Sequence, residues 1–276
     1  MKTSLYYLAT GIFLVLTGFC FAQNDAPLDR LTATFSDPEK PGEIEASVLS
    51  GGIKVTGYQG KEVIIETHVR STTLDEEDQK EISKGLRRLE ILTSGIEVEE
   101  ENNKMQISIE SMRNTVDLVL RVPVSTSLKL KCVNKGDLFV ENVEGDFEVE
   151  NINGKVTMAN ISGSVVAHAL NKDLTVVFNA VNPQKSMSFS SLNGDIDVTL
   201  PAKTKADLKV KNDMGETFTD FEVDFTGKSQ KTEHNNRQKG GKYRLHIDRF
   251  LYGELNGGGP EYQFTNFNGT IYIRSK

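Results

Sequence analysis

The sequence predicts an all-β protein whose short strands stack in parallel as a β-solenoid, and three observations carry this prediction. Glycine recurs every nine residues in the middle of the chain, apolar and polar residues alternate between the glycines, and Asn-Gly or proline ends several apolar runs. Alternation with a period of two indicates a strand with one buried face. A fixed repeat length is typical of strands that stack on one another.

The repeat begins at Gly136, Gly145, Gly154 and Gly163. Three positions of the nine-residue unit are apolar in every copy. The third position holds Leu138, Phe147, Val156 and Val165, the fifth holds Val140, Val149, Met158 and Ala167, and the eighth holds Val143, Ile152, Ile161 and Leu170. We therefore expect these side chains to be buried and the polar residues between them to face solvent.

One unit is too short to close a turn of such a stack, because nine residues of strand span only about 30 Å. Two units can form one flattened turn of roughly 18 residues. This arrangement would place Gly136 over Gly154 and Gly145 over Gly163, with the glycines at turns where the backbone has positive φ. It predicts two parallel sheets with an apolar seam between them.

The asparagines of the repeat and two Asn-Gly pairs bear on the connections between strands. Asn142, Asn151 and Asn160 occupy the seventh position and are expected at corners, where asparagine tolerates a left-handed backbone and its amide can hydrogen-bond along a ladder of like residues. Asn153-Gly154 and Asn193-Gly194 also suit tight hairpin turns. An antiparallel β-sandwich therefore remains the alternative fold.

The N-terminus predicts an exported protein. Lys2 is followed by an apolar run over residues 5–21 and a small residue at Ala22, which is the pattern of a signal peptide over residues 1–22. Lipid attachment at Cys20 is an alternative, although phenylalanine on both sides disfavours it. We expect a periplasmic, outer-surface or secreted protein.

Residues 23–42 are predicted as a linker and residues 43–276 as one β-strand-repeat domain. Early strands are predicted at Glu43–Leu49, Ile53–Gly57, Val63–Val69 and Gly95–Ile109 from their β-branched residues and alternation. Residues 74–92 differ, because four acidic residues precede apolar residues at helical spacing. This segment predicts an inserted amphipathic helix that covers an open sheet end. The polar segment 226–242 is predicted as a mobile loop.

Charge and cysteine content exclude several classes of function. The formal net charge of −7 argues against nucleic acid and anionic lipid as partners. Cys132 would be the one cysteine left after signal cleavage, so it is expected to be a buried apolar residue and not a nucleophile. No other segment is apolar enough over 18 residues to predict a membrane span.

The order of later elements resembles the bacterial "putative adhesin" family of β-strand-repeat domains. The matching elements are strands ended by proline at 119–123 and 198–201, Asn193-Gly194-Asp195-Ile196, the turn 254–260, and the closing Asn-Gly strand at 268–273. The resemblance covers residues 43–276 and implies an exported, all-β, non-enzymatic protein with an adhesive role. It implies no catalytic residues and no cofactor. The predicted helix departs from the usual pattern of the family.

Catalytic and metal-binding motifs are absent from the sequence. His68, His168, His234 and His246 lack ligand spacing, and no nucleophile elbow or phosphate-binding loop is found. We therefore predict no enzyme, no cofactor and no metal.

Two alternatives to a non-catalytic, adhesin-like surface or envelope interaction protein remain. Asp195 with Asp197, or Glu148 with Glu150, would lie on one outward strand face, which suits the paired carboxylates of a polysaccharide-active β-helix enzyme. A carbohydrate-binding module would depend on tyrosine, because the chain has no tryptophan; the candidates are Tyr252, Tyr262 and Tyr272. The expected partner is thus a protein or a glycan surface.

Overall fold

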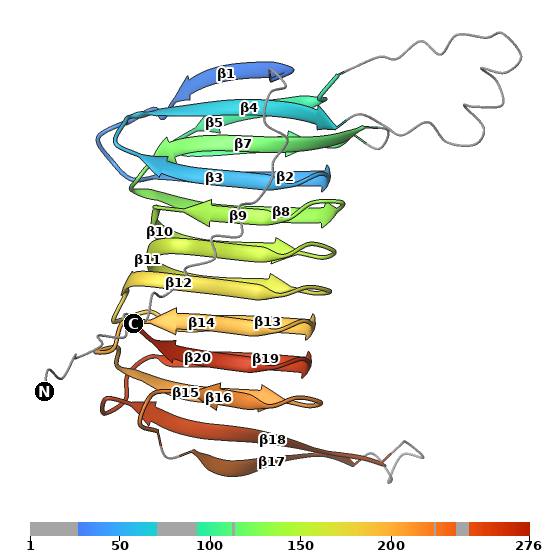
Figure 1. Cartoon of the computed structure of the whole chain (residues 1–276), viewed down its shortest axis with the longest axis vertical. Coiled ribbons are helices and arrows are strands. Elements are labelled where there is room, and N and C mark those ends of the chain that lie inside the picture. The colour runs from blue at the N-terminus through green and yellow to red at the C-terminus, as the bar shows by residue number, and fades with distance from the viewer. Residues whose placement is uncertain (1–26, 71–92, 112–113, 224, 236–242) are drawn as a thin grey trace, which may run out of the picture.

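The computed structural model describes residues 27–70, 93–111, 114–223, 225–235 and 243–276. This part of the chain is all-β, and its 20 strands join in one curled mixed sheet (Figure 1). It contains no α-helix. The predicted helix over residues 74–92 and the predicted signal peptide over residues 1–22 lie outside the described residues.

The strands have the following bounds. They are β1 (Asp29–Thr34), β2 (Gly42–Ser50), β3 (Ile53–Tyr58), β4 (Glu62–Arg70), β5 (Ile96–Glu101), β6 (Lys104–Ile109), β7 (Thr115–Pro123), β8 (Thr126–Asn134), β9 (Leu138–Glu141), β10 (Glu144–Asn151), β11 (Val156–Ala169), β12 (Leu174–Val181), β13 (Met187–Asn193), β14 (Ile196–Leu200), β15 (Ala206–Asn212), β16 (Thr217–Thr219), β17 (Thr226–Asn235), β18 (Tyr243–Leu255), β19 (Glu261–Asn268) and β20 (Ile271–Ser275).

Parallel pairing arranges most strands in two rows that run along the long axis of the molecule (Figure 1). Row A is β6, β2, β8, β10, the second half of β11, β13, β19 and β15. Row B is β7, β3, β9, the first half of β11, β12, β14, β20 and β16. We use the word coil for a strand of row A together with the strand of row B that follows it in the chain.

The predicted register is present in the middle of the chain. Gly145 lies opposite Gly163 and Leu138 lies opposite Val156, in parallel strands whose partners are 18 residues apart. Asn153-Gly154 and Asn193-Gly194 therefore do not form the hairpins of the alternative sandwich. Each Asn-Gly pair connects a strand of row A to the following strand of row B. These two strands do not form a hairpin with each other, because each of them pairs in parallel with strands of the neighbouring coils.

Antiparallel strands flank the parallel part at both ends. β1 pairs with β4 and β4 with β7 beside the first coils, while β5 pairs with β6. At the other end β15 pairs with β18 and β18 with β17. Two predictions are corrected here. Residues 29–34 of the predicted linker form β1, and residues 226–235 of the predicted loop form β17, because each segment completes the backbone hydrogen bonds of a neighbouring strand.

The order of the coils departs from chain order near the C-terminus. The coil β19–β20 lies between β13–β14 and β15–β16, so β19 pairs with β13 on one side and with β15 on the other. β20 makes the equivalent pairs with β14 and β16. Figure 1 shows this interruption as the red strands that lie between the two orange coils.

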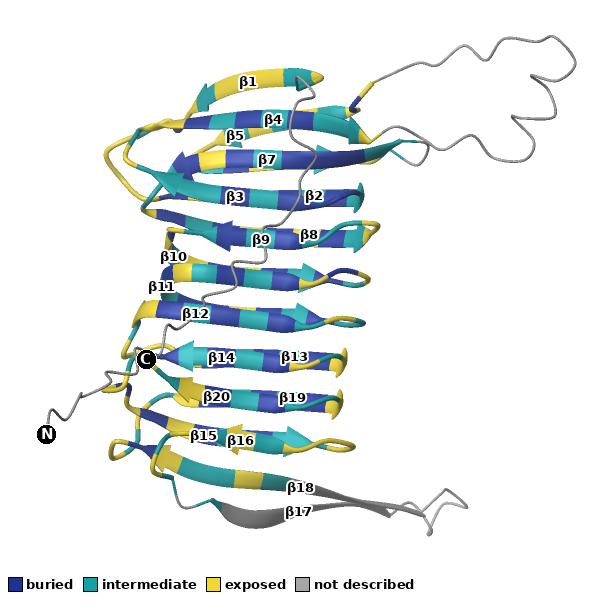
Figure 2. Ribbon diagram, viewed as in Figure 1, coloured by how far each residue is buried: buried dark blue, intermediate teal, exposed yellow. Residues whose placement is uncertain are grey.

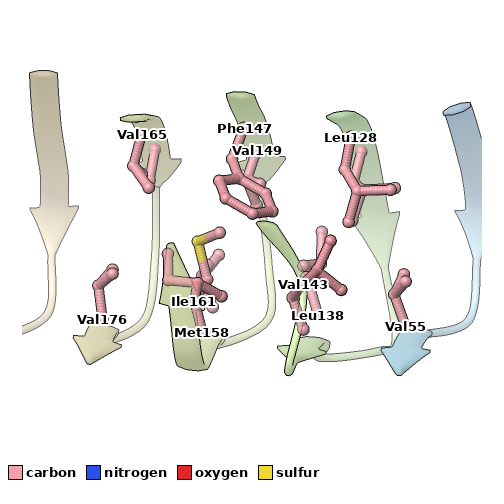
Figure 3. Packing of buried hydrophobic residues seen from close by; sticks show 14 of the residues in the cluster. Val55, Leu128, Leu138, Val143, Phe147, Val149, Met158, Ile161, Val165 and Val176 are labelled. Atoms are coloured by element: carbon pink, nitrogen blue, oxygen red, sulfur yellow. The ribbon is translucent and has the colours of Figure 1, made fainter. Parts of the chain in front are cut away.

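The hydrophobic core lies between the two rows. The third and fifth positions of the repeat are buried in all four copies, as predicted. Figure 3 shows Leu128, Phe147, Val149 and Val165 facing Leu138 and other side chains of the opposite row. Val149 is 2% exposed, whereas Glu148 beside it faces solvent, and Figure 2 shows this alternation along the stack.

The eighth position of the repeat behaves differently in alternate units. Val143 and Ile161 are buried, whereas Ile152 and Leu170 are only partly buried. One coil contains two units, so alternate units end at different corners of the coil. The nine-residue units are therefore similar in sequence without being equivalent in structure.

Three of the four repeat glycines serve a purpose other than the predicted one. Gly136, Gly145 and Gly154 do not have positive φ, whereas Gly163 has φ of 129°, as predicted. A Cβ at Gly154 would lie 1.9 Å from the carbonyl oxygen of Gly136, and one at Gly145 would lie 2.6 Å from that of Thr126. The side chain is excluded because the backbones of successive coils approach too closely at the corner.

The repeat asparagines divide in the same way as the eighth position. Asn142 and Asn160 have φ of 59° and 53°, as expected for left-handed corners. Asn151 is instead fully buried, and its Nδ2 donates to the carbonyl oxygens of Gly136 and Lys155 at 3.1 and 3.2 Å. Its Oδ1 accepts the Gly154 N–H at 3.0 Å. This side chain satisfies backbone groups that the corner leaves without ladder partners.

Candidate functional site

The two carboxylates of β10 are engaged with lysines of the neighbouring strand. Lys129 Nζ lies 3.8 Å from Glu148 Oε2, and Lys131 Nζ lies 3.0 Å from Glu150 Oε2. Both glutamates project from the outer face of row A, as the sequence predicted. They are the cross-strand ion pairs of a solvated sheet, each worth at most about 1 kcal/mol.

Asp195 and Asp197 are not brought together on one strand face. Asp195 precedes β14 at a corner, where its Oδ1 accepts the Thr270 N–H at 2.7 Å. Asp197 lies on the outer face of row B and accepts hydrogen bonds from Arg274 Nε at 2.8 and 3.1 Å. The prediction that both carboxylates lie on one strand face is wrong for Asp195, because β14 begins only at Ile196.

A column of aspartates at the corner before row B links one coil to the next. Asp137 accepts the N–H of Lys155, and Asp173 accepts that of Asp195. The pKa of Asp173 is lowered although its burial acts in the opposite direction, because hydrogen bonds from Lys155 and from the Asp195 N–H outweigh that burial. This column is structural. Asp137 and Asp195 follow a glycine in the sequence, whereas Asp173 follows Lys172, so the Gly-Asp pair was only a partial signal.

An asparagine ladder runs along the same corner, although its members are not the seventh-position asparagines for which a ladder was predicted. Asn153 donates to Asn134, Asn171 to Asn153 and Asn193 to Asn171, each from Nδ2 to Oδ1, at 2.8, 3.0 and 3.2 Å. The signal was an asparagine two residues after the last buried residue of each of these strands, Cys132, Asn151, Ala169 and Ser191. Such ladders stabilise stacked strands of like sequence.

Near the first coils, Asp117 is the centre of a buried polar network. This residue is 7% exposed. Its Oδ1 accepts the Gly52 N–H at 2.7 Å, and both carboxylate oxygens accept hydrogen bonds from the Arg70 guanidinium at 2.6 Å. Arg70 also donates to the Lys135 carbonyl oxygen at 2.7 Å. The network ties three coils together at one corner.

The remaining titratable candidates are dispersed. His68 lies on β4, and His168 Nδ1 lies 2.7 Å from Ser190 Oγ on the outer face of row A. His234 and His246 lie on β17 and β18, whose backbone alone is described at those positions. Among the described residues, no three His, Cys, Asp or Glu side chains form a group suited to a metal. Cys132 is fully buried, and its burial raises the pKa of the thiol to about 12.

The outer face of row A carries an open hollow of about 250 Å³ beside β5. Glu45, Glu97, Glu99 and Gln106 contribute to its lining. Lys104 Nζ lies 3.0 Å from Glu45 Oε2, and this hydrogen bond lowers the pKa of Glu45. The hollow is acidic and open to solvent, and none of its carboxylates belongs to the pairs predicted from the sequence.

The three predicted stacking tyrosines have different environments. Tyr262 is fully buried in the core, so its selection as a binding residue is wrong. The polar residues near it in the sequence gave no indication that its side chain points inward. Burial raises the pKa of its hydroxyl to about 12. Tyr252 lies on β18 with its ring centroid 6.1 Å from that of Phe250. Tyr272 lies on the outer face of row B.

An aromatic patch surrounds Tyr272, and we define it as Asp197, Phe218, Tyr272 and Arg274. The Phe218 and Tyr272 rings stack at 5.7 Å with an interplanar angle of 17°. The guanidinium carbon of Arg274 lies 4.7 Å from the Tyr272 ring centroid. The Arg274 guanidinium donates a hydrogen bond to the Asp197 carboxylate, and this hydrogen bond raises the pKa of Arg274. Phe218 remains 49% exposed on the edge strand β16.

No family model and no curated protein matches this chain. Two solved structures show a distant likeness. A putative cell adhesion protein from Clostridium sporogenes is 12% identical, with a TM-score of 0.46 over 91% of this chain and 100% of the other. A putative adhesin from Bacteroides fragilis is 14% identical, with a TM-score of 0.36 over 90% of this chain and 96% of the other. No helix in the described part of the chain is long and apolar enough to cross a membrane.

Proposed function

We propose that this chain is an exported, non-catalytic, adhesin-like protein that binds its partner through the outer faces of a β-solenoid. The observation that carries the proposal is the use of its carboxylates. Glu148, Glu150 and Asp197 are paired with cations, and Asp195 accepts a backbone N–H of the neighbouring coil. Groups used in this way stabilise and solubilise a surface, and they do not converge on a common point where a substrate could react.

The stacked architecture also supports binding over an extended surface. Parallel strands about 4.8 Å apart form long faces whose side chains are held in register. Binding energy on such a face is distributed over several residues, with a few aromatic or arginine anchors contributing most of it. Export is inferred from residues 1–22, which have the pattern of a cleaved signal peptide.

A turnover assay separates this proposal from the polysaccharide-active enzyme. Purified protein is incubated with acidic and neutral polysaccharides, and reducing ends and unsaturated products are measured. We expect no turnover, together with binding to cell-envelope or cell-surface material in a pull-down. Turnover that disappears in Asp195→Asn or Glu148→Gln would overturn the proposal, because removal of a catalytic carboxylate lowers rates by orders of magnitude.

Export is tested separately by fractionating cells that express the full chain. The N-terminus of the exported protein is determined by mass spectrometry. A chain that begins at Gln23 agrees with the proposal, whereas an intact N-terminus in the cytoplasmic fraction contradicts export.

A further inference from the structure

The outer face of row B carries a continuous line of hydroxyl, carboxylate and aromatic side chains. Thr157, Thr175, Asp197, Tyr272 and Phe218 occupy successive strands and lie directly opposite one another in the parallel register. Four strand spacings make this line about 19 Å long. Its last three members, Asp197, Tyr272 and Phe218, belong to the aromatic patch.

We infer that this line binds a neutral, extended saccharide chain, with Phe218 and Tyr272 as its anchors. The inference rests on the proposed binding function and names the class of ligand. Sugar rings combine an apolar C–H face with hydroxyl groups that donate and accept hydrogen bonds. A stacked pair of aromatic rings beside an Asp–Arg pair offers complementary groups for both features.

Charge favours a neutral ligand over an acidic one. The aromatic patch has one carboxylate and one guanidinium, and the two threonines of the line are uncharged. The whole chain carries a net charge of −7, which repels polyanions. An acidic glycan would therefore meet an unfavourable field, and Arg274, paired with Asp197, is the only cation that the line and the aromatic patch offer it.

The patch is also held rigid before any ligand arrives. Arg274 Nε is bonded to both oxygens of Asp197, and the Ser275 N–H next to it donates to Asp220 Oδ1 at 2.6 Å. The Tyr272 ring is in contact with Phe218 and with Arg274. Preorganised side chains lose little conformational entropy on binding, which favours recognition of a weakly interacting neutral ligand.

An extended peptide added to the open edge of β16 is the competing use of this surface. The strand contains only Thr217–Thr219 and has β20 as its described partner. Three residues offer few backbone hydrogen bonds, so little of the affinity of an added strand could come from the main chain. The side chains of the patch therefore favour the saccharide.

Calorimetric titration of the purified protein with soluble hexasaccharides tests the inference. Cellohexaose, xylohexaose and chitohexaose are the neutral probes, and hexagalacturonate is the acidic probe. We expect at least one neutral probe to bind and the acidic probe not to bind. The variants Phe218→Thr and Tyr272→Thr replace an aromatic anchor with threonine, the residue already present in the line at Thr157 and Thr175. Each should weaken binding on the order of tenfold or more.

Phe267→Thr is the matched control, because Phe267 is similarly exposed, at 45%, but lies at the end of β19 in row A. Its affinity for the neutral probe should match that of the unmodified protein. The inference is overturned if no neutral probe binds, or if Phe218→Thr and Phe267→Thr have equal affinity. Capture of an extended peptide at β16 without saccharide binding would overturn it as well.

These outcomes are distinct from failure of the proposed function. A protein that binds envelope material but none of the neutral probes retains its adhesin-like role and loses the assigned ligand. A protein that depolymerises a probe loses the proposed function itself.

Discussion

The middle of the chain and its C-terminal part use the same coil but assemble it in different orders. From β8 to β14 each coil stacks on the one before it, so neighbours in sequence are neighbours in space. At the C-terminal end, the late coil β19–β20 separates β13–β14 from β15–β16. The difference teaches that a repeat determines the shape of a coil and leaves its place in the stack to tertiary contacts.

The same difference has a consequence for folding. Pairing in the middle closes short loops, whereas β15 obtains its parallel partner only when residues 261–268 are in place. Closing longer loops costs more conformational entropy before contacts compensate for it. The C-terminal coils should therefore form later than the central ones and depend more on the packing of the inserted coil.

Burial of a charge in the central coils should have the largest effect on stability. Val149 is buried between the rows, so Val149→Asp would place a carboxylate in apolar surroundings and should prevent folding. Glu148→Lys, one residue earlier, changes an exposed side chain and should be nearly silent. Circular dichroism and thermal unfolding measure both. Equal tolerance of the two changes would refute the alternation of buried and exposed positions.

Removal of one buried aromatic ring from the inserted coil should destabilise the C-terminal coils before the central coils. Phe264 is fully buried on β19 and stacks on Phe189 at 5.0 Å. Phe264→Ala should cost about 3 to 5 kcal/mol. Hydrogen exchange should then show the earliest loss of protection in β15 and β18, while β8 and β10 remain protected.

Phe178→Ala supplies the control for that experiment. Phe178 is also fully buried but lies on β12, within the sequential coils. We expect a similar cost in stability with exchange spreading first through β11, β12 and β14. Identical exchange patterns in the two variants would contradict independent behaviour of the two regions.

Substitution of two glycines should distinguish two reasons for having glycine. At Gly154, in the middle of the chain, the reason is close approach of two backbones, and at Gly257, near the C-terminus, it is the backbone conformation. Gly154→Ala places a Cβ 1.9 Å from the Gly136 carbonyl oxygen and should cost about 3 kcal/mol, because the two coils must move apart. Gly257 has φ of 91° and open space around it, so Gly257→Ala should cost only about 1 kcal/mol. Denaturant unfolding gives both values, and the reverse order would contradict this assignment.

Acid should weaken the central coils slightly through Asp146. Hydrogen bonds from Lys185 and Ser164 lower the pKa of its carboxyl group in the folded protein. A folded pKa below the unfolded one contributes stability above about pH 4 and loses it as pH falls through the folded pKa. The side chain is 51% exposed, so solvent screening limits this contribution to less than about 1 kcal/mol.

Asp146→Asn tests that contribution by thermal unfolding at pH 7 and pH 3. The variant should be less stable than the unmodified protein at pH 7, and the difference should shrink at pH 3. A difference that is the same at both pH values would show that Asp146 contributes through its shape and not through its charge.

Several features were predictable because they depend on local pattern. The alternation around Val149 identified the buried face, and the spacing of Gly145 and Gly163 identified the register of neighbouring coils. Strand ends at Pro123 and Pro201 followed from the missing N–H of proline. Such signals act within one strand or one turn, where few alternative structures compete.

The site was harder to predict because its geometry depends on residues far apart in sequence. Tyr272 was identified from its residue type, whereas its partner Phe218 lies on a strand that only the inserted coil brings alongside. Tyr262 looked similar in sequence and is buried. Asp195 and Asp197 looked like a pair, but the corner directs one of them to the backbone of another coil.

The sequence by itself determined the all-β class, the strand alternation and the length of a central coil, because side-chain burial and corner geometry repeat with the period of the residues. The tertiary structure alone decided the position of β19–β20, the pairing of β1 and β17 with their neighbours, and the meeting of Phe218 with Tyr272. The physical reason is that strands with similar patterns can pair in many orders. Only the fit of whole coils and the closure of open sheet edges selects one order among them.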